Sequence, residues 1–222
     1  MPIPLRALAA LAAVAAFVSA CGGAHDKTPP PTVAASDLDK LLLGPDDINA
    51  VMGTNAMASD APFTELKQDQ ELMPNVNCLG PWQVAEQGVY GDSKPASVRG
   101  QRFTQPSPDN WDSLAVQAVV LYPSADDAKK FFAASSDRWS KCTNHRVNLS
   151  INGGPTTTYM FGDLTKSDTQ LSMPINQTPS GKPCQHALSV NSNVVVDVSA
   201  CTDGAKDQAA QIAQKIESRI TH

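Results

Sequence analysis

The chain has 222 residues, a formal net charge of −5 and an aromatic content of 5 %. This length suits one folded domain of ordinary size. The mild acidity argues against a nucleic-acid partner, because proteins bind phosphate backbones with basic surfaces. After residue 21 no apolar run approaches the roughly 20 residues that a membrane-spanning helix needs.

Residues 1–20 have the pattern of a bacterial lipoprotein signal peptide. Arg6 supplies a positive charge near the start, and residues 7–17 form an uninterrupted apolar segment. The segment leads into Val18-Ser19-Ala20-Cys21, an aliphatic residue and two small residues before a cysteine. The pattern predicts that Cys21 is lipidated and becomes the first residue of a protein on the extracytoplasmic face of the cell membrane. The alternative is an ordinary secretory signal that happens to precede a cysteine.

Residues 21–35 are expected to form a flexible tether between the lipid and a folded domain at 36–222. The segment contains Gly22-Gly23 and Pro29-Pro30-Pro31 and few bulky apolar side chains. Several acyl chains at about 0.8 kcal/mol per buried methylene would anchor such a tether stably. The membrane is therefore the first expected partner.

The folded region begins with two predicted short helices, one after the possible cap Ser36-Asp37 and one starting at Pro45. Residues 54–76 lack periodicity and are predicted to be a long loop. The apolar side chains of this loop either cover the core or line a binding surface. They are Met57, Phe63, Leu66, Leu72 and Met73.

The rest of the chain alternates between strand patterns and two helix patterns. Ser124 begins a predicted helix with a capping-box-like start, and residues 206–220 are predicted to form an amphipathic helix. Predicted strands cover 98–105, 113–122, 144–151, 156–163, 169–173, 184–190 and 194–201, and 175–183 is predicted to be a loop. Because short turns join successive strands, we expect an α+β fold with a mostly antiparallel sheet and helices packed on one face.

Four cysteines remain after Cys21, and they allow three pairings. A two-residue hairpin turn at Ser192-Asn193 would put Cys184 opposite Cys201 in a non-hydrogen-bonded pair. The Cα atoms of such a pair lie about 4.5 Å apart, within the range that a disulfide accepts. The second disulfide is then Cys78–Cys142. A free-thiol or metal site is the alternative, but no CxxC spacing occurs and exported proteins meet an oxidising compartment.

The same hairpin register makes His186 and Asp197 diagonal neighbours on one face of the sheet. Such a pair can orient an imidazole for acid–base chemistry, or it can be a packing or solvated pair. The exported chain contains no GxSxG, HExxH or P-loop motif. We therefore expect no enzyme, no catalytic residue, no metal site and no cofactor, and we keep His186 and Asp197 as weak ligand-binding candidates.

Several segments together resemble the PknH-like extracellular (sensor) domain family, which occurs on mycobacterial receptor Ser/Thr kinases and on free-standing lipoproteins. The resemblance covers roughly residues 36–220 and depends above all on the cysteine spacing. It implies the same disulfide pairing and a cleft between helices and sheet. The segments are Leu41-Leu42-Leu43, Pro45-Asp46-Asp47-Ile48, Cys78, Trp139-Ser140-Lys141-Cys142, Cys184-Gln185-His186-Ala187 and the valine-rich stretch 193–201.

The resemblance implies a sensor-like binding domain for an unidentified small molecule, glycan or other envelope component. The chain lacks kinase motifs, so signalling across a membrane is not carried over from the family. The alternative function is a protein-interaction or lipid-carrier lipoprotein of the cell envelope, with an envelope protein as the partner.

Overall fold

The computed structural model describes residues 32–150, 153–178 and 181–220. The expected signal peptide, the lipidation site Cys21 and residues 21–31 of the expected tether lie outside the described residues.

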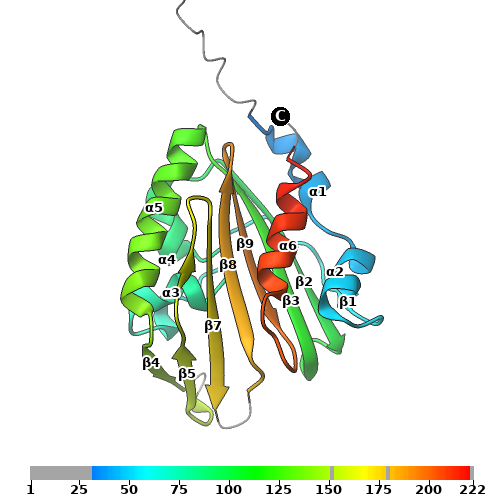
Figure 1. Ribbon diagram of the computed structural model, residues 1–222, viewed down its shortest axis with the longest axis vertical. Coiled ribbons are helices and arrows are strands. Elements are labelled where there is room, and N and C mark those ends of the chain that lie inside the picture. The colour runs from blue at the N-terminus through cyan, green and yellow to red at the C-terminus, as the bar shows by residue number, and fades with distance from the viewer. Residues whose placement is uncertain (1–31, 151–152, 179–180, 221–222) are drawn as a thin grey trace, which may run out of the picture.

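The described strands form one nine-stranded antiparallel sheet (Figure 1). The order across the sheet is β1-β2-β3-β9-β8-β7-β5-β4, and β6 pairs with β7. The strands are β1 (Ala58–Ser59), β2 (Ser97–Pro106), β3 (Trp111–Leu121), β4 (Arg146–Leu149), β5 (Thr157–Phe161), β6 (Thr165–Lys166), β7 (Gln170–Thr178), β8 (Cys184–Asn191) and β9 (Val194–Cys201). Strand β7 therefore extends into the segment 175–183 that the sequence predicted to be a loop.

The helices surround this sheet, and the predicted α+β class with a mostly antiparallel sheet and two disulfides is confirmed. The α-helices are α1 (Leu38–Leu41), α2 (Pro45–Met52), α3 (Val76–Trp82), α4 (Gln87–Tyr90), α5 (Ala125–Cys142) and α6 (Gln208–Glu217). Short 3₁₀ helices are η1 (Ala35–Asp37), η2 (Gln70–Leu72) and η3 (Gly91–Ser93).

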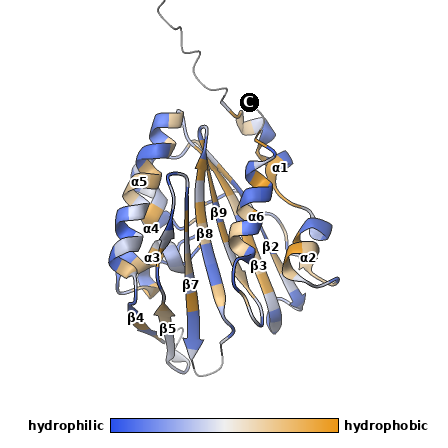
Figure 2. Ribbon diagram, viewed as in Figure 1, coloured by the Kyte–Doolittle hydropathy of each residue, from blue (hydrophilic) through white to orange (hydrophobic). Residues whose placement is uncertain are grey.

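The helices cover both faces of the sheet, and the expectation that they gather on one face is wrong. Helices α3, α4 and α5 pack on one face, and α1, α2 and α6 pack on the other. The physical reason is the apolar run in β9, where Val195 faces the first group of helices while Val194 and Val196 face the second. A central strand that is apolar on both sides needs a cover on both sides. In Figure 2 the central strands are coloured largely as hydrophobic residues.

Helix α5 begins as the sequence predicted. The side chain of Ser124 accepts a hydrogen bond from the backbone N–H of Asp127 at 3.1 Å. The hydroxyl of Ser124 in turn donates to Asp127 Oδ2 at 2.6 Å. This reciprocal cap fixes the start of the helix whose buried face carries Phe131 and Trp139.

The fold begins before residue 36. The side-chain Oδ1 of Asn193 accepts a hydrogen bond from the Val33 N–H at 2.8 Å, and its Nδ2 donates to the Val33 carbonyl at 3.1 Å. The same Nδ2 group donates to the carbonyl of Tyr122 at 3.1 Å. Val33, which the sequence analysis assigned to the tether, is therefore fastened to the turn between β8 and β9.

Two disulfides close the framework. Cys184 and Cys201 face each other in the β8–β9 register, with Cα atoms 4.0 Å apart. Cys78 and Cys142 join α3 to the last residue of α5, with Cα atoms 5.1 Å apart. The hairpin register predicted the pair Cys184–Cys201, and Cys78–Cys142 was the pair that remained.

A buried polar network lies between the sheet and the helices of the α5 side. Asp197 Oδ1 lies 2.5 Å from His186 Nε2, and Asp197 Oδ2 accepts hydrogen bonds from the Tyr90 hydroxyl at 2.7 Å and the Ala85 N–H at 2.9 Å. The side chains of His186 and Asp197 are 0 % and 3 % exposed. Burial, with the charge of Asp197 adding to it, raises the pKa of Tyr90 well above its ordinary value, so its phenol stays protonated and donates. The edge of Trp139 packs against the His186 ring, with centroids 5.1 Å apart.

Replacing Asp197 with asparagine should destabilise the domain strongly. In one orientation the asparagine NH2 group would face Tyr90 and Ala85, which are donors themselves, and in the other it would face His186 Nε2. In both orientations the network loses one acceptor oxygen and its negative charge. A buried polar group left unsatisfied costs about 1–3 kcal/mol, and more where a charged group is involved. The free energy of unfolding, measured by urea denaturation, checks this. Asp203→Asn is the matched control, because Asp203 is an exposed partner of Lys182 and should leave stability almost unchanged. An equal effect of the two substitutions would contradict the role assigned to Asp197.

Candidate functional site

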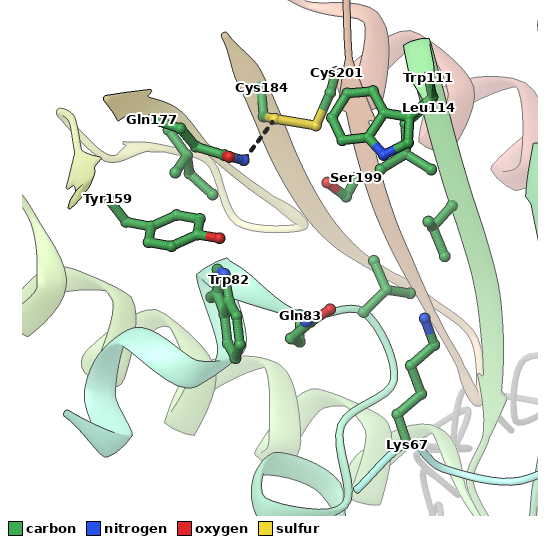
Figure 3. A pocket seen from close by; sticks show the side chains of 13 residues that line it. Lys67, Trp82, Gln83, Trp111, Leu114, Tyr159, Gln177, Cys184, Ser199 and Cys201 are labelled. Atoms are coloured by element: carbon green, nitrogen blue, oxygen red, sulfur yellow. Dashed lines mark hydrogen bonds between the residues drawn. A yellow bond between two sulfur atoms is a disulfide. The ribbon is translucent and has the colours of Figure 1, made fainter. Parts of the chain in front are cut away.

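A pocket of about 240 Å³ opens on the same face of the sheet as α3, α4 and α5 (Figure 3). Its wall combines the end of α3, the loop that carries residue 67, and strands β3, β5, β7, β8 and β9. The lining residues are Lys67, Trp82, Gln83, Val84, Trp111, Leu114, Val116, Tyr159, Ile175, Gln177, Cys184, Ser199 and Cys201.

Three aromatic side chains from separate elements converge on the pocket. Trp82 is the last residue of α3, Trp111 the first of β3, and Tyr159 lies in β5. Trp82 and Tyr159 meet edge to face, with centroids 5.8 Å apart and planes at 76°. Figure 3 shows Tyr159 and Trp111 at opposite sides of the pocket. Both indoles are only partly buried, so they expose apolar surface to the pocket.

Amide and hydroxyl groups are placed among these rings. Gln83 follows α3 directly, and its backbone N–H donates to the carbonyl of Leu79 at 3.0 Å. Gln177 lies in β7, and its Nε2 makes a long contact of 3.8 Å with Cys184 Sγ. Ser199 contributes a hydroxyl from β9. The pocket therefore has donors and acceptors on two of its sides (Figure 3).

Lys67 supplies the positive charge of the pocket. Its backbone is clamped to the segment before α4, because its N–H donates to Ala85 at 2.8 Å and its carbonyl accepts from Gln87 at 2.7 Å. The ammonium lies 5.4 Å from the centroid of the Phe63 ring. Within the described ranges Lys67 forms no salt bridge. Burial lowers the pKa of Lys67, an effect that the charges of nearby carboxylates oppose.

Glu86 fixes the loop that carries Lys67 through hydrogen bonds to its backbone. Both of its carboxylate oxygens lie 3.0 Å from the N–H of Asp69, which donates to them. The residue is fully buried, and burial raises the pKa of its carboxyl group. Glu86 therefore fixes the loop through the backbone and does not line the pocket.

The sequence-based ligand candidates do not reach this pocket. His186 and Asp197 are sealed inside the core, and neither is among the lining residues. The cysteine pair Cys184–Cys201, assigned from spacing alone, forms part of the wall. From the segment 54–76, only Lys67 lines the pocket. Its apolar residues cover the core instead, with Met57 and Met73 buried and Phe63 and Leu66 packed on the core edge.

Sequence reasoning missed the pocket residues Lys67, Trp82, Trp111, Tyr159 and Gln177. None of them belongs to a local motif, and they lie on elements far apart in the chain. Two tryptophans could have been considered as pocket residues, because each stands at the end of an element. Trp82 follows Gly80-Pro81 at the end of a helix, and Trp111 begins a strand. Nothing in the sequence showed that these ends meet.

The arrangement does not form a catalytic or metal centre in the described part of the chain. Ser199 lies opposite His186 in the β8–β9 register, but His186 is fully buried and its Nδ1 has no hydrogen-bond partner among the described residues. No hydrogen bond therefore activates the hydroxyl of Ser199 as a nucleophile. In the same residues no group of three or more His, Cys, Asp or Glu side chains could hold a metal ion.

Comparison with known sequences finds relatives among serine/threonine-protein kinases. The serine/threonine-protein kinases PknH of Mycobacterium bovis and Mycobacterium tuberculosis are each 34 % identical to the chain over 193 residues. The match covers 86 % of this chain but only 32 % and 30 % of the two kinases, so the chain spans about a third of their length.

A solved structure has the same architecture. The crystal structure of the extracellular domain of PknH from Mycobacterium tuberculosis superposes with a TM-score of 0.79 and 32 % sequence identity. The superposition covers 85 % of this chain and 97 % of that domain. The model of the PknH-like extracellular domain family matches residues 33–219. The chain therefore belongs to the PknH-like extracellular domain family.

Proposed function

We propose that this protein is a lipid-anchored, extracytoplasmic binding module of sensor type that takes up a small ligand in the pocket of Figure 3. The observation that carries the proposal is the pocket itself, where partly exposed aromatic rings and two amides converge with an ammonium that forms no salt bridge to any residue the structure describes. Binding sites typically combine apolar walls with a few convergent polar groups. Membership in an extracellular domain family supports the location outside the cytoplasmic membrane.

The attachment of Val33 to the hairpin turn supports an outward-facing pocket. Val33 is bound to Asn193 at the turn of the β8–β9 hairpin. The pocket lies at the other end of that hairpin, beside Cys184 and Cys201. Eight-residue strands separate the two ends by roughly 23 Å, at about 3.3 Å per residue. A domain held at Cys21 would thus keep its pocket away from the lipid surface.

The anchor is proposed to be the acylated Cys21, because Val18-Ser19-Ala20 precede this cysteine at the end of an apolar segment. None of the helices in the described part of the chain combines the length and hydropathy that a bilayer span requires. The domain itself is proposed to be non-catalytic. The His186–Asp197 pair supports this, because both side chains are buried and pair with each other inside the core. This pocket gives less support to a lipid-carrier role, because its volume of about 240 Å³ is too small for acyl chains.

Cys21→Ser should move the protein from the membrane to the soluble extracytoplasmic fraction. Without the thiol there is no site for the diacylglyceryl group, and the domain has its own core and disulfides. Fractionation with immunodetection measures the location, and intact mass measures the acyl addition. Far-UV circular dichroism of the released variant is the control for folding. Membrane retention of this variant would contradict the anchor.

A low-molecular-mass extract of the cell envelope should shift the indole N–H signals of Trp82 and Trp111 in ¹H–¹⁵N spectra. The chain has three tryptophans, and the third, Trp139, is 1 % exposed and packed on His186. Its signal is an internal control that should not move. Unchanged Trp82 and Trp111 signals, or equal shifts of all three, would contradict ligand binding in the pocket.

A further inference from the structure

We propose that the pocket binds one acidic sugar unit, a hydroxylated ring that carries a carboxylate or a phosphate group. The inference rests on the proposed ligand-binding function and names the chemical class of the ligand. It is based on the size of the pocket, its aromatic surfaces, its amides and its charge.

The size of the pocket limits the ligand to about one ring. Its volume of about 240 Å³ is below the roughly 300 Å³ at which drug-sized sites begin. An acyl chain or a peptide segment would extend beyond such a cavity. A hexose ring with one substituent fills it.

The aromatic surfaces suit the C–H faces of a sugar. Trp82 and Tyr159 form a corner with their planes at 76°, and Trp111 contributes a second partly exposed indole. Sugar rings pack their C–H groups against such faces while their hydroxyls point outward. The side chains of Gln83, Gln177 and Ser199 line the same pocket and can pair with those hydroxyls (Figure 3). An amide offers both donors and an acceptor, which fits vicinal hydroxyls.

The charge of Lys67 selects an acidic sugar over a neutral one. Its ammonium points toward the pocket in Figure 3 and has no salt-bridge partner among the described residues. The nearby carboxylates of Asp69, Asp197 and Glu86 act on Lys67 through their charges without forming an ion pair. The two buried ones accept hydrogen bonds from other groups, Glu86 from the backbone of Asp69 and Asp197 from Tyr90 and Ala85. A partly desolvated cation gains more from an anion than one in bulk water. An anionic ligand would also offset the burial that lowers the pKa of Lys67.

Defined probes test the class with the three indole signals as the readout. Glucuronate and glucose 6-phosphate carry the two acidic groups, and methyl β-glucoside is the neutral sugar. Benzoate and inorganic phosphate are anions without a sugar ring. Lys67→Gln removes the charge, and Lys130→Gln is the matched control, because Lys130 is an exposed residue of α5 whose side chain is 80 % exposed. Circular dichroism establishes that both variants are folded.

At least one acidic sugar should shift the Trp82 and Trp111 signals at concentrations about tenfold lower than methyl β-glucoside, and Trp139 should not respond. The advantage should disappear in Lys67→Gln and persist in Lys130→Gln. The preference between glucuronate and glucose 6-phosphate identifies the acidic group.

Equal binding of the neutral sugar, or an advantage that survives in Lys67→Gln, would overturn the proposal. So would benzoate or phosphate binding as tightly as the acidic sugars. If the envelope extract moves the pocket signals and neither acidic sugar does, the ligand class is wrong while the binding function stands. If neither the extract nor any probe moves them, the binding function fails as well.

Discussion

The geometry of this domain depends on the hydrogen bonds of one buried carboxylate, that of Asp197. It lies in the middle of a valine-rich strand, shares a hydrogen bond with His186 in β8, and accepts hydrogen bonds from Tyr90 in α4 and from the backbone of Ala85. Ala85 has a left-handed conformation, with φ of 54°, which a non-glycine residue adopts only when its surroundings hold it there. The network therefore fixes the segment between α3 and α4 against the sheet. That segment also forms hydrogen bonds with the backbone of Lys67. The carboxylate of Asp197, which does not line the pocket, therefore sets the position of Lys67, which does.

The opposite face of the sheet is organised by neutral amides. Gln117 in β3 exchanges two hydrogen bonds with the backbone of Leu43, at 2.8 and 3.0 Å. Gln185 in β8 accepts from the N–H of Ala210 in the first turn of α6 at 3.1 Å. Asn193 holds Val33 at the hairpin turn. Each amide satisfies a backbone group that helix packing would otherwise bury unpaired, which is costly. Together they attach the N-terminal segment and α6 to a sheet that is covered on both sides.

The proposed function depends on a difference between the two faces of the sheet. One face is closed by α1, α2 and α6 and carries the connection toward Cys21. The other face leaves a gap between the end of α3 and the strands, and the Cys184–Cys201 disulfide forms part of its wall. The family shared with the extracellular domain of PknH explains the framework.

The sequence by itself determined the local features of this protein. Ser124 marked the start of α5, and the turn at Ser192-Asn193 set the register that pairs Cys184 with Cys201, because capping and hairpin pairing depend on neighbouring residues. The tertiary structure alone decided that helices cover both faces, that His186 and Asp197 are sealed, and that Lys67, Trp82 and Trp111 meet. Such contacts join residues that are distant in the chain, and their proximity depends on packing that no local pattern encodes.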